Sequence, residues 1–107
     1  MESFNIQELV QTRTNQRSFH VVSDSNVRVE FRNMAAGERL DPFAYQGSLV
    51  VTCFRGAFVL RADAASKELV VMDQAVVSAN ERVVLECTLD GTVQIIWSPP
   101  YAATTKG

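Results

Sequence analysis

The sequence predicts an all-β fold, a small double-sheet barrel preceded by a short helix. Two observations lead to this expectation. Short runs rich in Val, Ile, Leu, Phe and Thr follow one another at close, even spacing, and turn-forming residues separate them. The 107 residues suffice for one domain with an ordinary hydrophobic core. We expect one domain over 1–107, with a helix and connector at 1–17, a barrel over about 18–100 and a flexible tail at 101–107.

The helix is predicted near the start of the chain. Asn5 is a favourable N-cap, and Glu8 stands three residues later, as in a capping box. Ile6, Leu9 and Val10 would form the apolar side of about two turns. Because so short a helix is marginal alone, it has to pack against the barrel.

The strands follow in order, separated by turns. Around Phe31, apolar and charged residues alternate with a period of two, so this strand has one apolar face. Asp90-Gly91, between two apolar runs, is typical of a hairpin turn, and Pro99-Pro100 ends the last strand. The expected strands are 18–22, 27–34, 49–54, 57–61, 69–72, 76–77, 83–89 and 93–97, and the expected turns are 24–26, 36–38 and 64–67.

Charge and composition restrict the class of partner. The net charge is −2, and ten basic residues are spread among twelve acidic ones without a basic stripe. This pattern argues against a nucleic-acid or anionic-membrane partner. The first residues lack the pattern of a signal peptide, and no apolar run is long enough to span a membrane, so we expect a cytoplasmic protein. Cys53 and Cys87 are then expected to be free thiols.

The stretch from Gly37 to Gly56 keeps the spacing of a metal-binding motif but not its ligands. The first motif of the cupin superfamily places two His and one Glu between two such glycines. Here those three positions hold Phe43, Tyr45 and Leu49, which are not ordinary ligands of a transition metal, apart from an occasional Tyr on iron(III). From about 27 to 100 the chain resembles small, single-domain, RmlC-like cupins, and this implies a double-stranded β-helix, or jelly-roll barrel.

The second cupin motif fits the same resemblance and keeps only its aspartate, Asp73. Met72 and Asn80 stand at its glycine positions and Ser78 at its proline. Val83 stands at the histidine and Cys87 at the asparagine. Since neither motif keeps a histidine, no ordinary cupin metal site can be assembled. The resemblance therefore implies a metal-free cupin without a cofactor.

In cupins the ligand side chains point into the barrel mouth. Other residues on the same face of each strand then point into the barrel as well. Because strand side chains alternate, an inward Leu49 or Val83 brings every second residue inward with it. The side chains either fill the barrel or line a cavity for an apolar or aromatic molecule that Tyr45 would orient. The predicted pocket residues are Phe43, Tyr45, Leu49, Val51, Cys53, Val83, Leu85 and Cys87.

Three functions remain open, and we favour a binding module or sensor for a small apolar or aromatic molecule over an enzyme. The alternative is a metal-independent isomerase or cyclase that uses Tyr45 as acid or base, with Glu38 or Asp41 as a mouth carboxylate. A third is a structural dimer that regulates a partner protein. Arg39 and Arg55 could hold an anionic group at the rim.

Two further features have structural as well as functional interpretations. His20, the only histidine, is expected to be structural, because a Cys53–Cys87–His20 metal cluster would lack the Cys-x-x-Cys spacing. The outward-facing residues of strand 49–54 are too apolar for a free surface, so the N-terminal segment or a second subunit should cover them. The resemblance to small cupins, which form homodimers, implies the same assembly here, and we predict a homodimer. These outward residues are Val50, Thr52 and Phe54.

Overall fold

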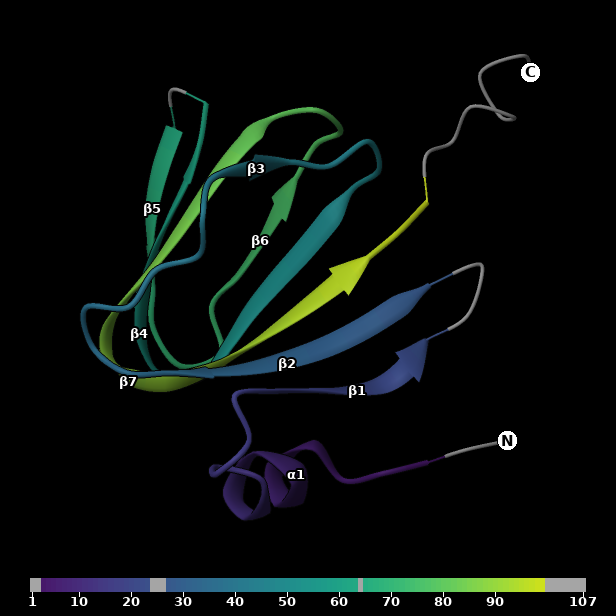
Figure 1. Ribbon diagram of the computed structural model, residues 1–107, viewed down its shortest axis with the longest axis vertical. Helices are drawn as coiled ribbons and strands as arrows, with labels where there is room; N and C mark the ends of the chain where they lie inside the picture. The colour runs from purple at the N-terminus through teal and green to yellow at the C-terminus, as the bar shows by residue number, and fades with distance from the viewer. Residues whose placement is uncertain (1–2, 24–26, 64, 100–107) are drawn as a thin grey trace.

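The computed structural model describes residues 3–23, 27–63 and 65–99 (Figure 1). The expected turn at 24–26, the first residue of the 64–67 turn, Pro100 and the expected tail at 101–107 lie outside the described residues. The elements, in chain order, are α1 (Ile6–Thr12), β1 (Ser18–Ser23), β2 (Arg28–Met34), β3 (Phe43–Ala44), β4 (Leu49–Ala62), β5 (Ala65–Leu69), β6 (Gln74–Val77) and β7 (Arg82–Trp97).

Two long antiparallel strands, β4 and β7, form the frame of the molecule. They pair from Leu49 opposite Trp97 to Ala62 opposite Val83, with register shifts between Cys53 and Phe58. Each strand bends at these shifts, so that its two halves belong to two facing layers. Hydrogen bonding continues through the bends, and the seven strands form one sheet folded on itself.

Glycine is required at both bends. Gly56 has a φ of +76°, and a Cβ there would lie 2.3 Å from the carbonyl oxygen of Asp90. A Cβ on Gly91 would lie 2.1 Å from the carbonyl oxygen of Arg55. Any side chain at either position would collide with the backbone of the other strand. The two strands can therefore cross this closely only because both crossing positions are glycine.

The two layers form a jelly-roll barrel. In one layer the order is β1, β2, the second half of β7, the first half of β4, and β6. In the other the order is β3, the first half of β7, the second half of β4, and β5. The bends close one end of the barrel and the opposite end is its mouth (Figure 1). The predicted all-β jelly roll with a short N-terminal helix is confirmed.

Several predicted boundaries were wrong. Asp90-Gly91 is not a hairpin turn, because β7 runs through it, and the runs 49–54 and 57–61 are one strand. The predicted strand at 69–72 is also wrong. β5 ends at Leu69, and a turn follows in which the amide of Asp73 donates to the carbonyl of Val70. Part of the predicted turn at 64–67 belongs to β5, and β3 was not predicted.

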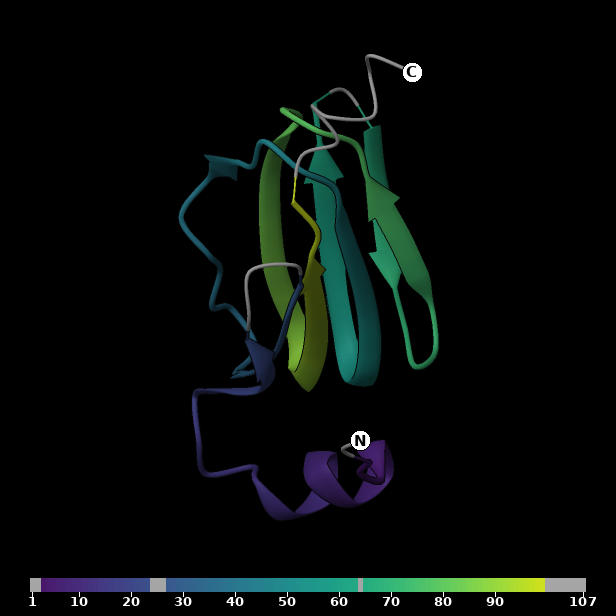
Figure 2. The ribbon, with the colours of Figure 1, turned by 90° about the vertical axis from the view of Figure 1, so that its right-hand side faces the viewer.

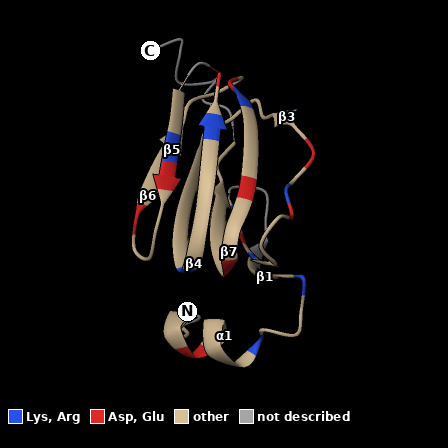
Figure 3. Cartoon of the chain, turned by 90° about the vertical axis from the view of Figure 1, so that its left-hand side faces the viewer, with Lys and Arg blue, Asp and Glu red and all other residues tan. Residues whose placement is uncertain are grey.

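The helix α1 begins and packs as its sequence indicates. The Asn5 side chain accepts a hydrogen bond of 2.9 Å from the amide of Glu8. Val10 is buried beside Phe19, Phe31 and the outward-facing Phe54, so the N-terminal segment covers this part of the sheet. Figures 2 and 3 show α1 beneath the closed end of the barrel. In the described part of the chain, no helix has the length and apolar character needed to cross a membrane.

Candidate functional site

The backbone supports the alignment of both motifs. A positive φ is the left-handed region that glycine favours. It occurs at all four motif positions that cupins fill with glycine, including the two where this chain has another residue. Among the other described residues, only Asp63 has a positive φ, at 51°. The four motif positions are Gly37 (93°), Gly56 (76°), Met72 (73°) and Asn80 (70°).

The positions of the missing metal ligands meet at the barrel mouth. Phe43 on β3 lies opposite Val83 on β7, and Leu49 on β4 lies opposite Trp97. The Trp97 ring lies 5.5 Å from the Phe43 ring and 5.0 Å from the Tyr45 ring, centroid to centroid, and the Tyr45 contact is edge-on at 88°. The three aromatic residues are partly exposed, so the mouth presents an aromatic surface.

The predicted pocket residues lie in or against one core cluster inside the barrel. Six of them are at most 2% exposed, and Phe43 and Tyr45 pack against them from the mouth. The amide of Asn80 donates to the carbonyl of Tyr45 at 2.7 Å, which ties the second motif to the first. That these residues bind a molecule stays a prediction. The six buried residues are Leu49, Val51, Cys53, Val83, Leu85 and Cys87.

The two cysteines lie at the closed end of the barrel, away from the mouth. Both are buried free thiols. The Cys53 Sγ lies 3.4 Å from the carbonyl of Arg55, and the Cys87 Sγ lies 3.1 Å from the carbonyl of Leu89. Burial raises the pKa of both thiols, because removal from water disfavours the thiolate. These cysteines therefore favour the unreactive protonated form.

A charged residue inside the barrel was missed by sequence reasoning. Glu30 on β2 lies opposite Ile95, a core residue, and is 3% exposed. Its Oε1 accepts a hydrogen bond of 3.1 Å from Trp97 Nε1, and its Oε2 lies 2.8 Å from Arg32 Nε. Glu30 therefore fixes the Trp97 ring at the mouth. The apolar face of β2 points the other way, toward the cluster under α1, and only the long-range register reveals this.

A positively charged side chain, Arg28, also contacts Trp97 at the mouth. The Arg28 guanidinium lies over the Trp97 ring, 4.4 Å from its centroid. Since Arg28 is opposite Trp97 in the β2–β7 register, this contact follows directly from strand pairing. The indole is thus held by a carboxylate at its N–H and by a cation on its face.

The other polar candidates do not join the mouth cluster as a catalytic group. Glu38 pairs with Arg17 at 2.7 Å and accepts from the amide of Ala35 at 2.8 Å. Asp41 and Arg39 are exposed, as is His20, which lies on β1 opposite Glu30. Arg55 is not at the rim. It lies at the closed end, where its Nε donates to Thr92 Oγ1 at 3.2 Å.

Comparison with known proteins shows similarity at the level of structure. No family model and no curated protein matches the sequence. A cupin superfamily protein from Desulfitobacterium hafniense matches with a TM-score of 0.78 at 20% identity, over 91% of this chain and 90% of that one. An RmlC-like cupin from Desulfovibrio desulfuricans matches with a TM-score of 0.76 at 19% identity, over 94% and 98%. The chain has the cupin fold.

Cupin barrels also occur in enzymes. A salicylate 1,2-dioxygenase from Pseudoaminobacter salicylatoxidans matches with a TM-score of 0.71 at 20% identity, over 83% of this chain and 28% of that one. The resemblance inferred from the two motifs is confirmed for the fold.

The residues of this cupin barrel do not fit the metal that its fold family implies. Phe43, Leu49 and Val83 offer no donor atom, and Tyr45 alone could not hold an ion. Within residues 3–23, 27–63 and 65–99, no three His, Cys, Asp or Glu side chains gather where they could bind a metal. The conceivable cluster of Cys53, Cys87 and His20 is therefore not formed.

Proposed function

We propose that this cupin binds a small apolar or aromatic molecule at the barrel mouth, as a sensor or carrier in the cytoplasm. The observation that carries the proposal is the partly exposed aromatic cluster of Phe43, Tyr45 and Trp97, in which Phe43 and Tyr45 stand at two of the ligand positions of a metal-binding cupin. Aromatic rings provide a large apolar contact area, and the Tyr45 hydroxyl adds a polar handle.

A preformed mouth favours binding, because little order has to be created when the ligand arrives. The Trp97 ring is fixed by Glu30 at its N–H and by Arg28 on its face. A ligand would then meet a surface whose largest ring already has one orientation, which lowers the entropic cost of association.

The alternative, a metal-independent isomerase or cyclase based on Tyr45, has less support. Such chemistry needs a carboxylate free to exchange a proton with the substrate. Glu30 is engaged by Trp97 and Arg32, and Glu38 by Arg17 and the amide of Ala35. Of the candidate carboxylates among the described residues, only Asp41 has no such partner, and it is exposed to solvent rather than held against Tyr45.

The test uses the natural reporter at the site, since Trp97 is the only tryptophan. Toluene, benzyl alcohol and cyclohexanol serve as minimal probes, and thermal unfolding and Trp97 emission are measured in parallel. A probe that binds the folded state raises the melting temperature. We expect the same probe to change Trp97 emission with the same saturation curve.

Variants of the mouth separate binding from non-specific solvent effects. Phe43→Ala should weaken the probe about tenfold or more, because it removes one wall of the aromatic cluster. Leu89→Ala, at an exposed apolar residue on β7, is the control and should bind normally. The proposal would be contradicted by probes that stabilise the protein without changing Trp97 emission. It would also be contradicted by probes that bind Phe43→Ala as tightly as the wild type.

A further inference from the structure

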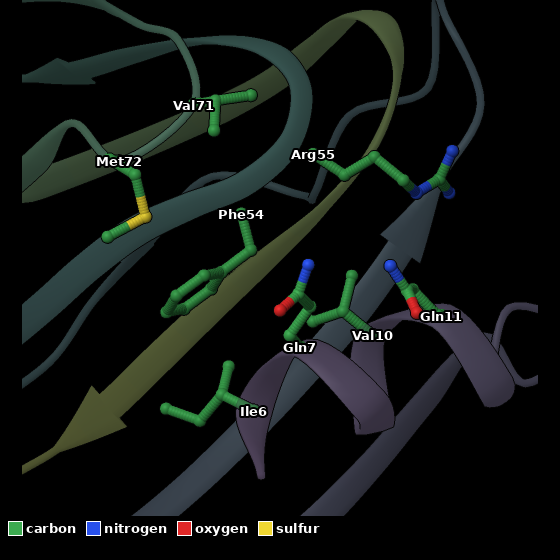
Figure 4. Close-up of a pocket in the computed structure, with 8 residues that line it drawn as sticks. All are labelled: Ile6, Gln7, Val10, Gln11, Phe54, Arg55, Val71 and Met72. Carbon is green, nitrogen blue, oxygen red and sulfur yellow. The ribbon is translucent and has the colours of Figure 1, made fainter.

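A concave surface lies outside the barrel, between α1 and the closed end. Figure 4 shows side chains from the helix facing side chains from β4 and from the turn after β5. Its volume is about 490 Å³, within the range of roughly 300–1,000 Å³ typical of small-molecule sites. We call it the outer groove, and it is lined by Ile6, Gln7, Val10, Gln11, Phe54, Arg55, Val71 and Met72.

The apolar part of the outer groove is unusually exposed. Val71 is 54% exposed and Met72 68% exposed, and they face Phe54 and Ile6 across the groove (Figure 4). Single exposed apolar residues need no explanation, but several gathered on a concave surface mark a binding site. The groove is open to a ligand, whereas the core under α1 is closed by Val10.

The polar part of the groove carries one positive charge. The Arg55 Nε donates to Thr92 Oγ1, and among the described residues its terminal nitrogens have no further hydrogen-bond or ion-pair partner. Figure 4 shows its guanidinium on the same side as the Gln11 amide. No lining residue is acidic. Two acidic residues adjoin lining residues in the sequence: Glu8, beside Gln7 on α1, is exposed, and Asp73, beside Met72, accepts a hydrogen bond from the amide of Val70.

This charge distribution selects one class of ligand. An apolar molecule alone would leave the Arg55 guanidinium without an anion, and a cation would be repelled by it. A carboxylate can accept two parallel hydrogen bonds from a guanidinium, which adds both energy and orientation. We propose that the outer groove is a second binding site, for a small amphipathic carboxylate whose chain lies against Phe54 and Met72 and whose head group pairs with Arg55.

The experiment uses octanoate as the probe and octan-1-ol as its neutral counterpart. Methionine methyl groups labelled with carbon-13 report the position, because Met72 lines the outer groove and Met34 lies in the barrel core. We expect octanoate to shift the Met72 signal saturably while the Met34 signal and Trp97 emission stay unchanged. Octan-1-ol should bind about tenfold more weakly, since it loses the charge-assisted hydrogen bonds.

Two substitutions test the charge. Arg55→Met should reduce octanoate affinity about tenfold, to that of octan-1-ol. Arg61→Met is the matched control, because Arg61 lies near the C-terminal end of the same strand, away from the bend, and is half exposed; its octanoate affinity should stay normal. Should Arg55→Met fold poorly, Gln7→Phe gives a second test, because its ring would occupy the groove and abolish the Met72 shift.

The outcomes distinguish this site from the barrel mouth. An unshifted Met72 signal, or equal affinity of wild type and Arg55→Met for octanoate, would overturn the proposal. A shift of Met34 or of Trp97 emission without Met72 would also overturn it and would place the acid inside the barrel. Failure of the aromatic probes at the mouth leaves the outer groove unaffected, because its readout is a different side chain.

Discussion

Met72 and Asn80 both adopt the left-handed backbone conformation, with φ values of 73° and 70°. Asn visits this region readily, because its short polar side chain can hydrogen-bond locally. For Met the same conformation costs about 1–2 kcal/mol, because Cβ approaches the following carbonyl oxygen. The turn after β5 therefore keeps a backbone suited to glycine while presenting an apolar side chain at the outer groove.

The first prediction follows from this strain. Met72→Gly should stabilise the protein by about 0.5–1 kcal/mol, since relief of the backbone strain exceeds the entropic cost of glycine. Met72 is 68% exposed, so little packing is lost. Urea unfolding measures the change. Met72→Ala, which keeps a Cβ, is the control and should give no gain. A less stable Met72→Gly protein would show that the side chain contributes more than its backbone costs.

The buried thiols give a prediction at alkaline pH. Burial raises the pKa of Cys53 and Cys87 above the ordinary value of 9.0, so the folded protein holds these protons to higher pH than the unfolded chain does. The stability that this difference contributes is complete below about pH 9 and is lost as the pH rises through the folded-state values. Stability should therefore fall more steeply above about pH 9 in the wild type than in a Cys53→Ala, Cys87→Ala double variant.

Urea unfolding at a series of pH values compares the slopes rather than the absolute stabilities. The double variant will be less stable at every pH, because two core side chains become smaller. Only the difference in slope tests the thiols, since the two proteins differ in no other ionisable group. Parallel profiles would mean that the thiols ionise alike in the folded and unfolded states.

At the scale of elements, local signals predicted α1 well and the two long strands poorly. The helix depends on Asn5 and on an apolar side visible within a few residues. The bends in β4 and β7 depend on Gly56 and Gly91 crossing each other, a contact between residues distant in the chain. Asp90-Gly91 has the composition of a hairpin turn, and nothing local shows that the strand continues through it.

The candidate site also contains some residues that the sequence could predict and others that only strand pairing reveals. Phe43, Tyr45 and Leu49 could be found because motif spacing fixes their places on β3, just after it and at the start of β4. Glu30 and Trp97 could not, because their contact arises from the pairing of β2 with β7. The alternating pattern of β2 shows one charged and one apolar face but does not say which face is inside. The outer groove likewise exists only because α1 packs beneath the closed end.

At the scale of the whole molecule, one part of the outer sheet surface is left uncovered. Cross-strand register aligns an apolar row across four strands, on the face opposite the barrel core. The helix α1 covers the neighbouring part, around Phe31 and Phe54, but the far end of this row is open, with Val76 69% exposed. The row consists of Val76 on β6, Val50 on β4, Ile96 on β7 and Val29 on β2.

We predict that this row is buried in a homodimer. An apolar row on the outer face of a sheet can meet its own copy around a two-fold axis, and such symmetric contacts are the commonest in oligomers. Val76→Lys should shift the protein toward monomer, with dimer affinity reduced about tenfold or more, because the charge would be buried against apolar residues. Sedimentation velocity at micromolar concentration measures the distribution between monomer and dimer.

Leu89→Lys, at an equally prominent apolar residue on β7 with 61% exposure, is the control and should remain dimeric. A monomeric wild type would refute the dimer. A dimer broken by Leu89→Lys but not by Val76→Lys would place the interface on the other layer.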